Sequence, residues 1–180
     1  MLSLLETRQY ELCLEIAQTA HKGQFRRDGK TPYVEHPIKV SKMNGIDGTC
    51  FRMCAGLLHD VLEDTPWTED DLRKAGVWSD IIDIVKVLTK REGMSYYEYL
   101  TNILDFDHGL DVDDATAVKI ADIVSNLTDT PTPKQIAKYT KALMILACTE
   151  GNKIRYSYKS DNLRSIEKDL KKMYSYNKMS

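Results

Sequence analysis

A chain of 180 residues fits one domain, and we expect a single domain over residues 1–180. Hydrophobic residues make up 42% of the chain, which is enough for one continuous core and argues against a wholly disordered protein. The formal net charge is −2, from 25 basic and 27 acidic side chains, and this near balance argues against a generic nucleic-acid-binding protein.

The N-terminal segment carries charge at Glu6 and Arg8 and has no long apolar run, so it resembles neither a signal peptide nor a membrane anchor. The cysteines form no CxxC pair. Cys50 and Cys54 are four residues apart in an apolar helical pattern, which favours packing as small hydrophobic residues over zinc binding. These features predict a cytoplasmic protein with no membrane contact.

Helical periodicity dominates the first half of the chain. Apolar residues from Leu5 to Ala20 fall on one helical stripe, and the turn-prone residues 27–30 follow it. Pro37 is tolerated in a first helical turn, so a second helix is expected to begin near His36. Apolar residues at spacings of three and four then predict one helix from about Thr49 to Leu62.

The second half follows the same pattern. Thr68 and Asp71 have the spacing of a helix start with an acidic first turn. Apolar spacing predicts further helices over residues 77–88, 95–106, 112–127, 136–148 and 163–176. Strand signals are weak, because no alternating apolar run lies between hairpin turns. We therefore expect an all-α fold.

The segment from His59 to Thr65 carries the first candidate chemistry. On a helix, His59 and Glu63 share one face, as do Asp60 and Asp64, on the side away from the apolar stripe. Acidic residues at the exposed end of a helix are common, so a solvated face is the alternative. Adjacent helical residues point about 100° apart, so His59 and Asp60 can bind one ion only at a helix edge, with other ligands from elsewhere.

Asp122 and His36 are candidates for those other ligands. Asp122 shares a helical face with Lys119 and Asn126, although an ordinary polar face exposed to water has the same pattern. His36 is equally compatible with a surface or core histidine. Two histidines and two aspartates suit a borderline divalent ion, but the spacing alone does not select them.

Four segments carry a family resemblance. They are AHKGQFRRDG (residues 20–29), TPYVEHP (31–37), AGLLHDVLEDT (55–65) and VKIADIVSN (118–126). In this order and at these intervals, they resemble the HD superfamily. Within it they are similar to the hydrolase domain of the RelA/SpoT homologues, and most of all to the small stand-alone alarmone hydrolases.

The resemblance implies an HD-type helical bundle that removes the 3′-pyrophosphate from a guanosine alarmone, a small-molecule nucleotide substrate. It implies a divalent ion of the manganese type (Mn²⁺), bound by His36, His59, Asp60 and Asp122. It also implies that Glu63 and Asp64 assist the attacking water as the catalytic pair, and that Arg26 and Asn126 lie against the substrate. Arginine can hold phosphate oxygens in a fork, and Arg27 and Lys90 are expected to add positive charge.

Two positions depart from the alarmone hydrolases. Thr128 stands where they carry an arginine, and Asp28 stands where a serine or lysine is usual. Both changes remove or oppose positive charge near a polyanionic substrate. Two alternatives therefore stay open: an HD phosphohydrolase acting on another nucleotide, such as a nucleoside monophosphate or a phosphorylated dinucleotide, and a catalytically silent nucleotide-binding module. Nothing in the sequence indicates an oligomeric state.

Overall fold

The computed structural model describes residues 2–45, 49–107 and 114–147. All of them belong to one compact unit, Met1–Glu150, whereas the second unit, Gly151–Ser180, lies outside the described residues. The helix expected over residues 163–176 also lies outside them. A single domain over residues 1–180 therefore stays a prediction.

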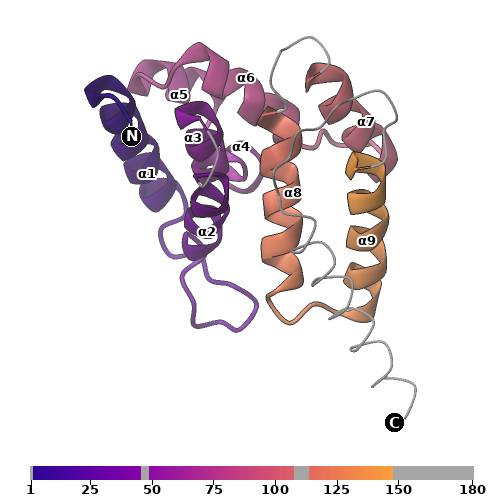
Figure 1. Ribbon diagram of the computed structural model, residues 1–180. Helices are drawn as coiled ribbons and strands as arrows, with labels where there is room; N and C mark the ends of the chain where they lie inside the picture. The colour runs from indigo at the N-terminus through magenta and orange to yellow at the C-terminus, as the bar shows by residue number, and fades with distance from the viewer. Residues whose placement is uncertain (1, 46–48, 108–113, 148–180) are drawn as a thin grey trace. The chain divides into compact units, whose positions relative to one another are not determined.

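The described residues are helical, apart from loops and one isolated β-bridge between Phe25 and Pro32. The prediction of an all-α fold is confirmed. The helices, labelled in Figure 1, are α1 (Leu4–Ala20), α2 (Glu35–Asn44), α3 (Cys50–Leu58), α4 (Val61–Asp64), α5 (Glu69–Ala75), α6 (Ser79–Leu88), α7 (Tyr96–Asp107), α8 (Asp114–Leu127) and α9 (Pro133–Ala147).

Helix α5 begins as the sequence predicts. The Thr68 hydroxyl accepts a hydrogen bond from the backbone N–H of Asp71 at 3.2 Å, and the Asp71 carboxylate accepts one from the Thr68 N–H at 3.0 Å. This reciprocal pair satisfies backbone donors that the first turn of a helix leaves without partners. The helix ends at Ala75, and Gly76 follows with a φ of 96°, in the left-handed region that glycine adopts without strain.

Helices α3 and α8 form the centre of the described unit. Helix α3 packs against α1, α2, α6 and α8, and α8 in turn packs against α2, α6, α7 and α9 (Figure 1). Leu57, Leu58 and Ile123 are completely buried in this core. Each such side chain contributes about 1.5–3 kcal/mol by leaving water. The central helices therefore provide a rigid support for the polar residues that they carry.

A glycine allows α2 and α3 to approach each other closely. A Cβ atom at Gly56 would lie 2.9 Å from the Cα of Ser41, a separation that real Cβ atoms do not show. Glycine at this position lets the two backbones touch. Helix α2 carries His36, and His59 follows α3 directly, so this contact brings the two imidazoles together.

The single helix predicted from about residue 49 to 62 is wrong, because the structure divides it. Helix α3 ends at Leu58 and α4 begins at Val61, with His59 and Asp60 at the junction. The apolar stripe did not reveal this break because Val61 remains completely buried beyond it. At the junction Asp60 has φ −100° and ψ −5°, which departs from regular helical values, whereas His59 keeps φ −58° and ψ −29°.

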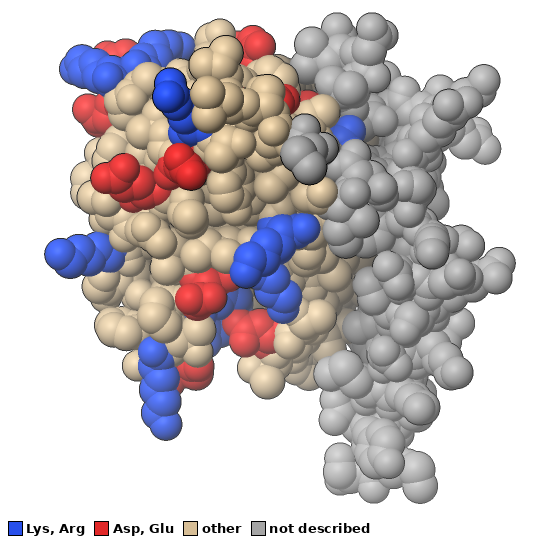
Figure 2. All heavy atoms as spheres, turned by 60° about the vertical axis from the view of Figure 1, so that its left-hand side comes forward, with Lys and Arg blue, Asp and Glu red and all other residues tan. Residues whose placement is uncertain are grey.

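The surface of the described residues carries charges of both signs. On the described part of the face in Figure 2, basic and acidic side chains are interspersed and form no continuous field of one sign. None of the helices found among the described residues is long and apolar enough to cross a membrane.

Candidate metal centre

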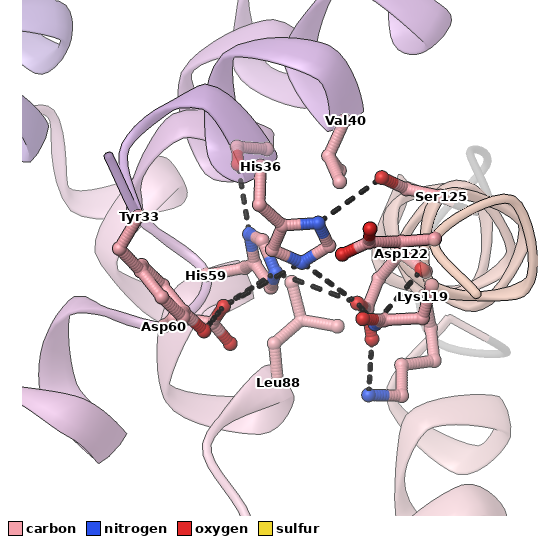
Figure 3. Close-up of polar contacts among 12 residues, drawn as sticks. Tyr33, His36, Val40, His59, Asp60, Leu88, Lys119, Asp122 and Ser125 are labelled. Carbon is pink, nitrogen blue, oxygen red and sulfur yellow. Dashed lines mark hydrogen bonds and ion pairs between the residues drawn. The ribbon is translucent and has the colours of Figure 1, made fainter. Parts of the chain in front are cut away.

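Two imidazoles and two carboxylates from separate elements meet at one point (Figure 3). The Nε2 atom of His36 lies 3.1 Å from Oδ1 of Asp122 and 3.7 Å from Oδ2 of Asp60. The Nε2 atom of His59 lies 3.1 Å from the same Asp60 oxygen and 3.8 Å from the same Asp122 oxygen. The four side chains that the sequence analysis proposed as metal ligands are thus brought together.

The Nδ1 atom of each imidazole, which does not face the carboxylates, contacts a partner of its own. His59 Nδ1 lies 2.8 Å from the backbone oxygen of Gly56, and His36 Nδ1 lies 3.0 Å from the Ser125 hydroxyl oxygen. A carbonyl oxygen can only accept, so His59 donates from Nδ1. Such contacts orient the ring and leave the Nε2 lone pair for a metal.

The donor set fits a divalent cation. His36, His59 and Asp60 each place one ligand atom within 4.8 Å of the others. His59 Nε2 is buried, and it has no partner with hydrogen-bonding geometry among the described residues. Buried polar atoms of this kind normally have a partner. Two imidazole nitrogens with carboxylate oxygens suit borderline ions of the first transition row.

The charges in the cluster are strongly coupled. Burial by itself raises the pKa of Asp60, but the neighbouring His59 holds it at about 2. Burial also opposes the charged form of His59, yet Asp60 and Asp122 raise its pKa to about 10. Burial lowers the pKa of His36, which leaves that imidazole neutral. The carboxylates thus favour a positive charge at the point where a cation would lie.

Tyr33, in the loop before α2, contacts two carboxylates through its hydroxyl group. Its hydroxyl lies 2.7 Å from Oδ2 of Asp60 and 3.2 Å from Oδ2 of Asp64. Burial, together with the two carboxylates, raises the pKa of Tyr33, so the hydroxyl keeps its proton and acts as a donor. The Tyr33 ring also lies 4.8 Å from the ring of His21. Tyr33 therefore orients Asp60 and links it to Asp64.

Lys119 neutralises the Asp122 oxygen that does not face the histidines. Its ammonium lies 2.7 Å from Oδ2 of Asp122. Burial disfavours both charges, but the pairing raises the pKa of Lys119 and holds the pKa of Asp122 well below its usual value. Asp122 is therefore anchored in its ionised form, with Oδ1 directed to the imidazoles.

The two acidic residues predicted as the catalytic pair lie on the exposed side of the cluster. Glu63 accepts a hydrogen bond from the backbone N–H of Lys90 at 3.0 Å, through Oε2. Asp64 is held by Tyr33 and, through its backbone oxygen, by the Gln24 side chain at 2.9 Å. Both carboxylates are solvent-accessible and are fixed by neighbouring segments.

Arg26 and Asn126 form a second group beside the cluster. The Asn126 amide donates to Oδ1 of Asp122 at 2.6 Å, and its Oδ1 accepts from Arg26 Nη2 at 3.2 Å. The same Arg26 nitrogen lies 2.6 Å from Asp129. The structure thus connects Arg26 to the metal ligands through Asn126.

The other two predicted substrate-binding residues are not part of this group. The Arg27 guanidinium donates to the Gln135 side chain at 2.7 Å. Within the described residues, Lys90 donates a hydrogen bond to Glu63 through its backbone N–H. Their assignment to the substrate stays a prediction.

The sequence analysis missed the roles of Tyr33, Lys119 and Ser125. Tyr33 lies within the TPYVEHP segment, but its position there does not indicate a contact with Asp60. Lys119 was recognised on the same helical face as Asp122, and this spacing of three was the available signal. Nothing in the sequence pointed to Ser125, because its partner His36 is 89 residues away.

A comparison with family models finds a match to the family described as "HD domain" over residues 13–169. The match covers most of the chain and contains all four clustered side chains.

Two proteins of similar sequence are named for the same activity. The chain is 43% identical over 81 residues to the guanosine-3′,5′-bis(diphosphate) 3′-pyrophosphohydrolase of Haemophilus influenzae, covering 42% of this chain and 11% of that protein. It is 35% identical over 127 residues to the guanosine-3′,5′-bis(diphosphate) 3′-pyrophosphohydrolase MESH1 of Xenopus tropicalis, covering 66% of this chain and 69% of that one. The chain thus spans only about a tenth of the Haemophilus protein.

One solved structure is similar over almost the whole chain. It is described as "A metazoan ortholog of SpoT hydrolyzes ppGpp and plays a role in starvation responses". The TM-score is 0.67 at 24% identity, and the alignment covers 98% of this chain and 97% of that one. At this identity, the likeness supports the fold.

Proposed function

The chain belongs to the HD domain family, and we propose that it is a metal-dependent phosphohydrolase that removes the 3′-pyrophosphate from guanosine 3′,5′-bis(diphosphate). One observation carries this proposal: His36, His59, Asp60 and Asp122 converge on one point beside an acidic pair. The names of the relatives from Haemophilus influenzae and Xenopus tropicalis support the choice of substrate.

A divalent ion held by these four side chains would neutralise phosphate charge and acidify water. Glu63 and Asp64 would accept and return protons, and their exposure and their contacts with Lys90 and Tyr33 support this role. Arg26 and Asn126 would position the substrate, with the guanidinium donating to phosphate oxygens. Arg26 would then exchange its contact with Asp129 for one with the substrate.

The proposed reaction is a single hydrolysis. The oxygen of water forms a bond to the phosphorus attached to the ribose 3′ oxygen, and the bond between that phosphorus and the 3′ oxygen breaks. The proton lost by water passes to Glu63 or Asp64, and the same carboxyl group returns a proton to the 3′ oxygen, which leaves as a hydroxyl. The products are a guanosine 5′-diphosphate and pyrophosphate.

The structure offers a reason why the two departures from the alarmone hydrolases do not exclude this substrate. At Thr128, the hydroxyl accepts a hydrogen bond from the Lys39 ammonium at 2.6 Å, so α2 supplies a cation where the arginine is missing. The Asp28 carboxylate accepts hydrogen bonds from Lys30 N–H and Thr31 N–H, both at 2.9 Å. Asp28 therefore shapes its own loop.

The test is release of pyrophosphate from guanosine 3′,5′-bis(diphosphate) by metal-loaded protein. Asp60→Ala is expected to abolish it, because it removes a metal ligand held between His59 and Tyr33. The matched control is Asp105→Ala, which removes an exposed carboxylate from α7 and is expected to leave turnover unchanged. A folded, metal-loaded wild type that releases no pyrophosphate refutes the proposal.

Assays with a panel of other nucleotides distinguish this proposal from the two alternative functions. Faster turnover of a nucleoside monophosphate or phosphorylated dinucleotide would support the alternative substrate, whereas tight binding without turnover in any divalent metal would support a silent binding module. Manganese as the native ion and a cytoplasmic location are further parts of our proposal. Metal analysis of protein purified without added metal tests the first of these.

A further inference from the structure

Two lysines beside the metal centre contact tyrosines of α7. Lys119 belongs to α8 and Lys138 belongs to α9. Two tyrosines of α7 connect them: Lys119 Nζ lies 5.0 Å from the ring centre of Tyr99, and Lys138 Nζ lies 4.1 Å from that of Tyr96. The two rings are 6.0 Å apart, so these groups form one cluster.

The two ammonium groups differ in their partners: a carboxylate neutralises Lys119, and none among the described residues neutralises Lys138. Lys119 is paired with Asp122 at 2.7 Å. In the part of the chain that the structure describes, Lys138 forms no ion pair, and its ammonium lies over the Tyr96 ring. A cation over an aromatic face is stabilised but not neutralised, and it can still donate to an anion.

Tyr96 presents a second group without a partner. Its hydroxyl oxygen is buried and forms no hydrogen bond among the described residues. Leaving such a group without a partner costs about 1–3 kcal/mol, so most buried hydroxyls are satisfied. A hydroxyl donor beside an unpaired ammonium has the chemistry of a site for an anionic oxygen.

This site adjoins the proposed reaction centre. Burial, Lys119 and Lys90 lower the pKa of Lys138, whereas Asp122 and Glu63 oppose that effect. The geometry gives the same link: the Tyr96 ring lies 6.0 Å from the Tyr99 ring, and Lys119, 5.0 Å from the Tyr99 ring centre, lies 2.7 Å from Oδ2 of Asp122. A phosphate group bound to Lys138 could therefore belong to the same pyrophosphate as a phosphate group bound at the metal.

We propose that Lys138 and Tyr96 form a phosphate-binding subsite that holds the terminal phosphate of the substrate's 3′-pyrophosphate and, after hydrolysis, the pyrophosphate product. The ammonium of Lys138 donates to one phosphate oxygen and the Tyr96 hydroxyl donates to another. This inference rests on the proposed function. It adds ligands of the pyrophosphate group that water attacks, and these lie on α7 and α9 and not on the segments that bind the metal.

The experiment is calorimetric titration of inorganic pyrophosphate into the manganese-loaded full chain. Lys138→Gln is expected to weaken binding about tenfold, as loss of one charge-assisted hydrogen bond does. Lys141→Gln is the matched control, because it removes the same charge from an exposed position on the same helix. It is expected to bind pyrophosphate as the wild type does. Equal affinity for wild type and Lys138→Gln overturns the inference.

Tyr96→Phe gives a second readout that a merely structural role would not produce. Removing a buried hydroxyl that has no partner should leave the melting temperature of the ligand-free protein unchanged or higher. The rise in melting temperature on adding pyrophosphate should become smaller than in the wild type. An equal rise in both proteins would contradict a contact between the hydroxyl and the anion.

The outcomes separate this inference from the proposed function. If the wild type binds pyrophosphate through Lys138 but hydrolyses no guanosine 3′,5′-bis(diphosphate), the subsite stands and the substrate assignment fails. If the wild type hydrolyses that substrate and Lys138→Gln does so with unchanged KM, kcat and pyrophosphate inhibition, the subsite fails alone. A wild type that binds no pyrophosphate also overturns the subsite.

Discussion

Replacement of Tyr33 by phenylalanine tests how the metal ligands are held. The hydroxyl donates to Asp60 at 2.7 Å, the shorter of its two contacts, and lies 3.2 Å from Asp64. Tyr33→Phe removes that hydrogen bond and keeps the ring, so the contacts with His21 and His36 remain. The change is therefore confined to the orientation of the carboxylates.

The expected magnitude follows from the chemistry of the contact. A hydrogen bond to a charged group contributes about 1.5–3 kcal/mol, and about 1.4 kcal/mol corresponds to a tenfold change in an equilibrium constant. We therefore expect Tyr33→Phe to bind manganese roughly 10–100-fold more weakly than the wild type, the range found when partners of metal ligands are removed.

The assay is a manganese titration of wild type and Tyr33→Phe, with Tyr97→Phe as the control. Tyr97 is 64% exposed and lies on α7, so its hydroxyl is not expected to influence the metal. If Tyr33→Phe keeps the wild-type affinity, the reasoning that Tyr33 positions Asp60 is refuted.

Three further predictions concern charge. Lys119→Met leaves the buried Asp122 carboxylate without its cation, so we expect the free energy of unfolding without metal to fall by about 3 kcal/mol in denaturant titrations; an unchanged value would contradict this. The pKa of His59 is about 10 without metal, so metal binding at pH 8 should release about one proton, and affinity should fall about tenfold per unit as the pH is lowered. Calorimetry in buffers of different ionisation enthalpy measures the released proton, and no buffer dependence would refute it. Hydrogen bonds from Thr31 lower the pKa of Asp28 from 3.8 to about 2, so this contribution is complete above pH 3.8 and is lost as the pH falls towards 2. Acid unfolding of Asp28→Ala should lack that component, and identical acid profiles would contradict the assignment.

Most of the helices could be predicted because each buries one apolar face. The expected helix over residues 112–127 is observed as α8, Asp114–Leu127, and the Thr68 start of α5 is also observed. The break after Leu58 could not be predicted in this way, because Val61 continues the apolar stripe beyond it. Periodicity reports which residues are buried, and it is insensitive to a short change of direction between two buried turns.

Residue spacing predicted the candidate site less well than it predicted the helices. His36 and Asp122 are 86 residues apart and meet because α2 and α8 pack side by side. Family resemblance supplied this pairing, whereas the residues alone left a solvated polar face as an equal alternative. The contacts of Tyr33 and Ser125 depend on tertiary packing in the same way, so no local pattern revealed them.

The most direct test of the account is anomalous diffraction from a crystal of the manganese-loaded protein. The account predicts one manganese peak in contact with His36 Nε2, His59 Nε2, Asp60 and Asp122. A peak at any other group of residues, or none at this one under saturating manganese, would contradict it.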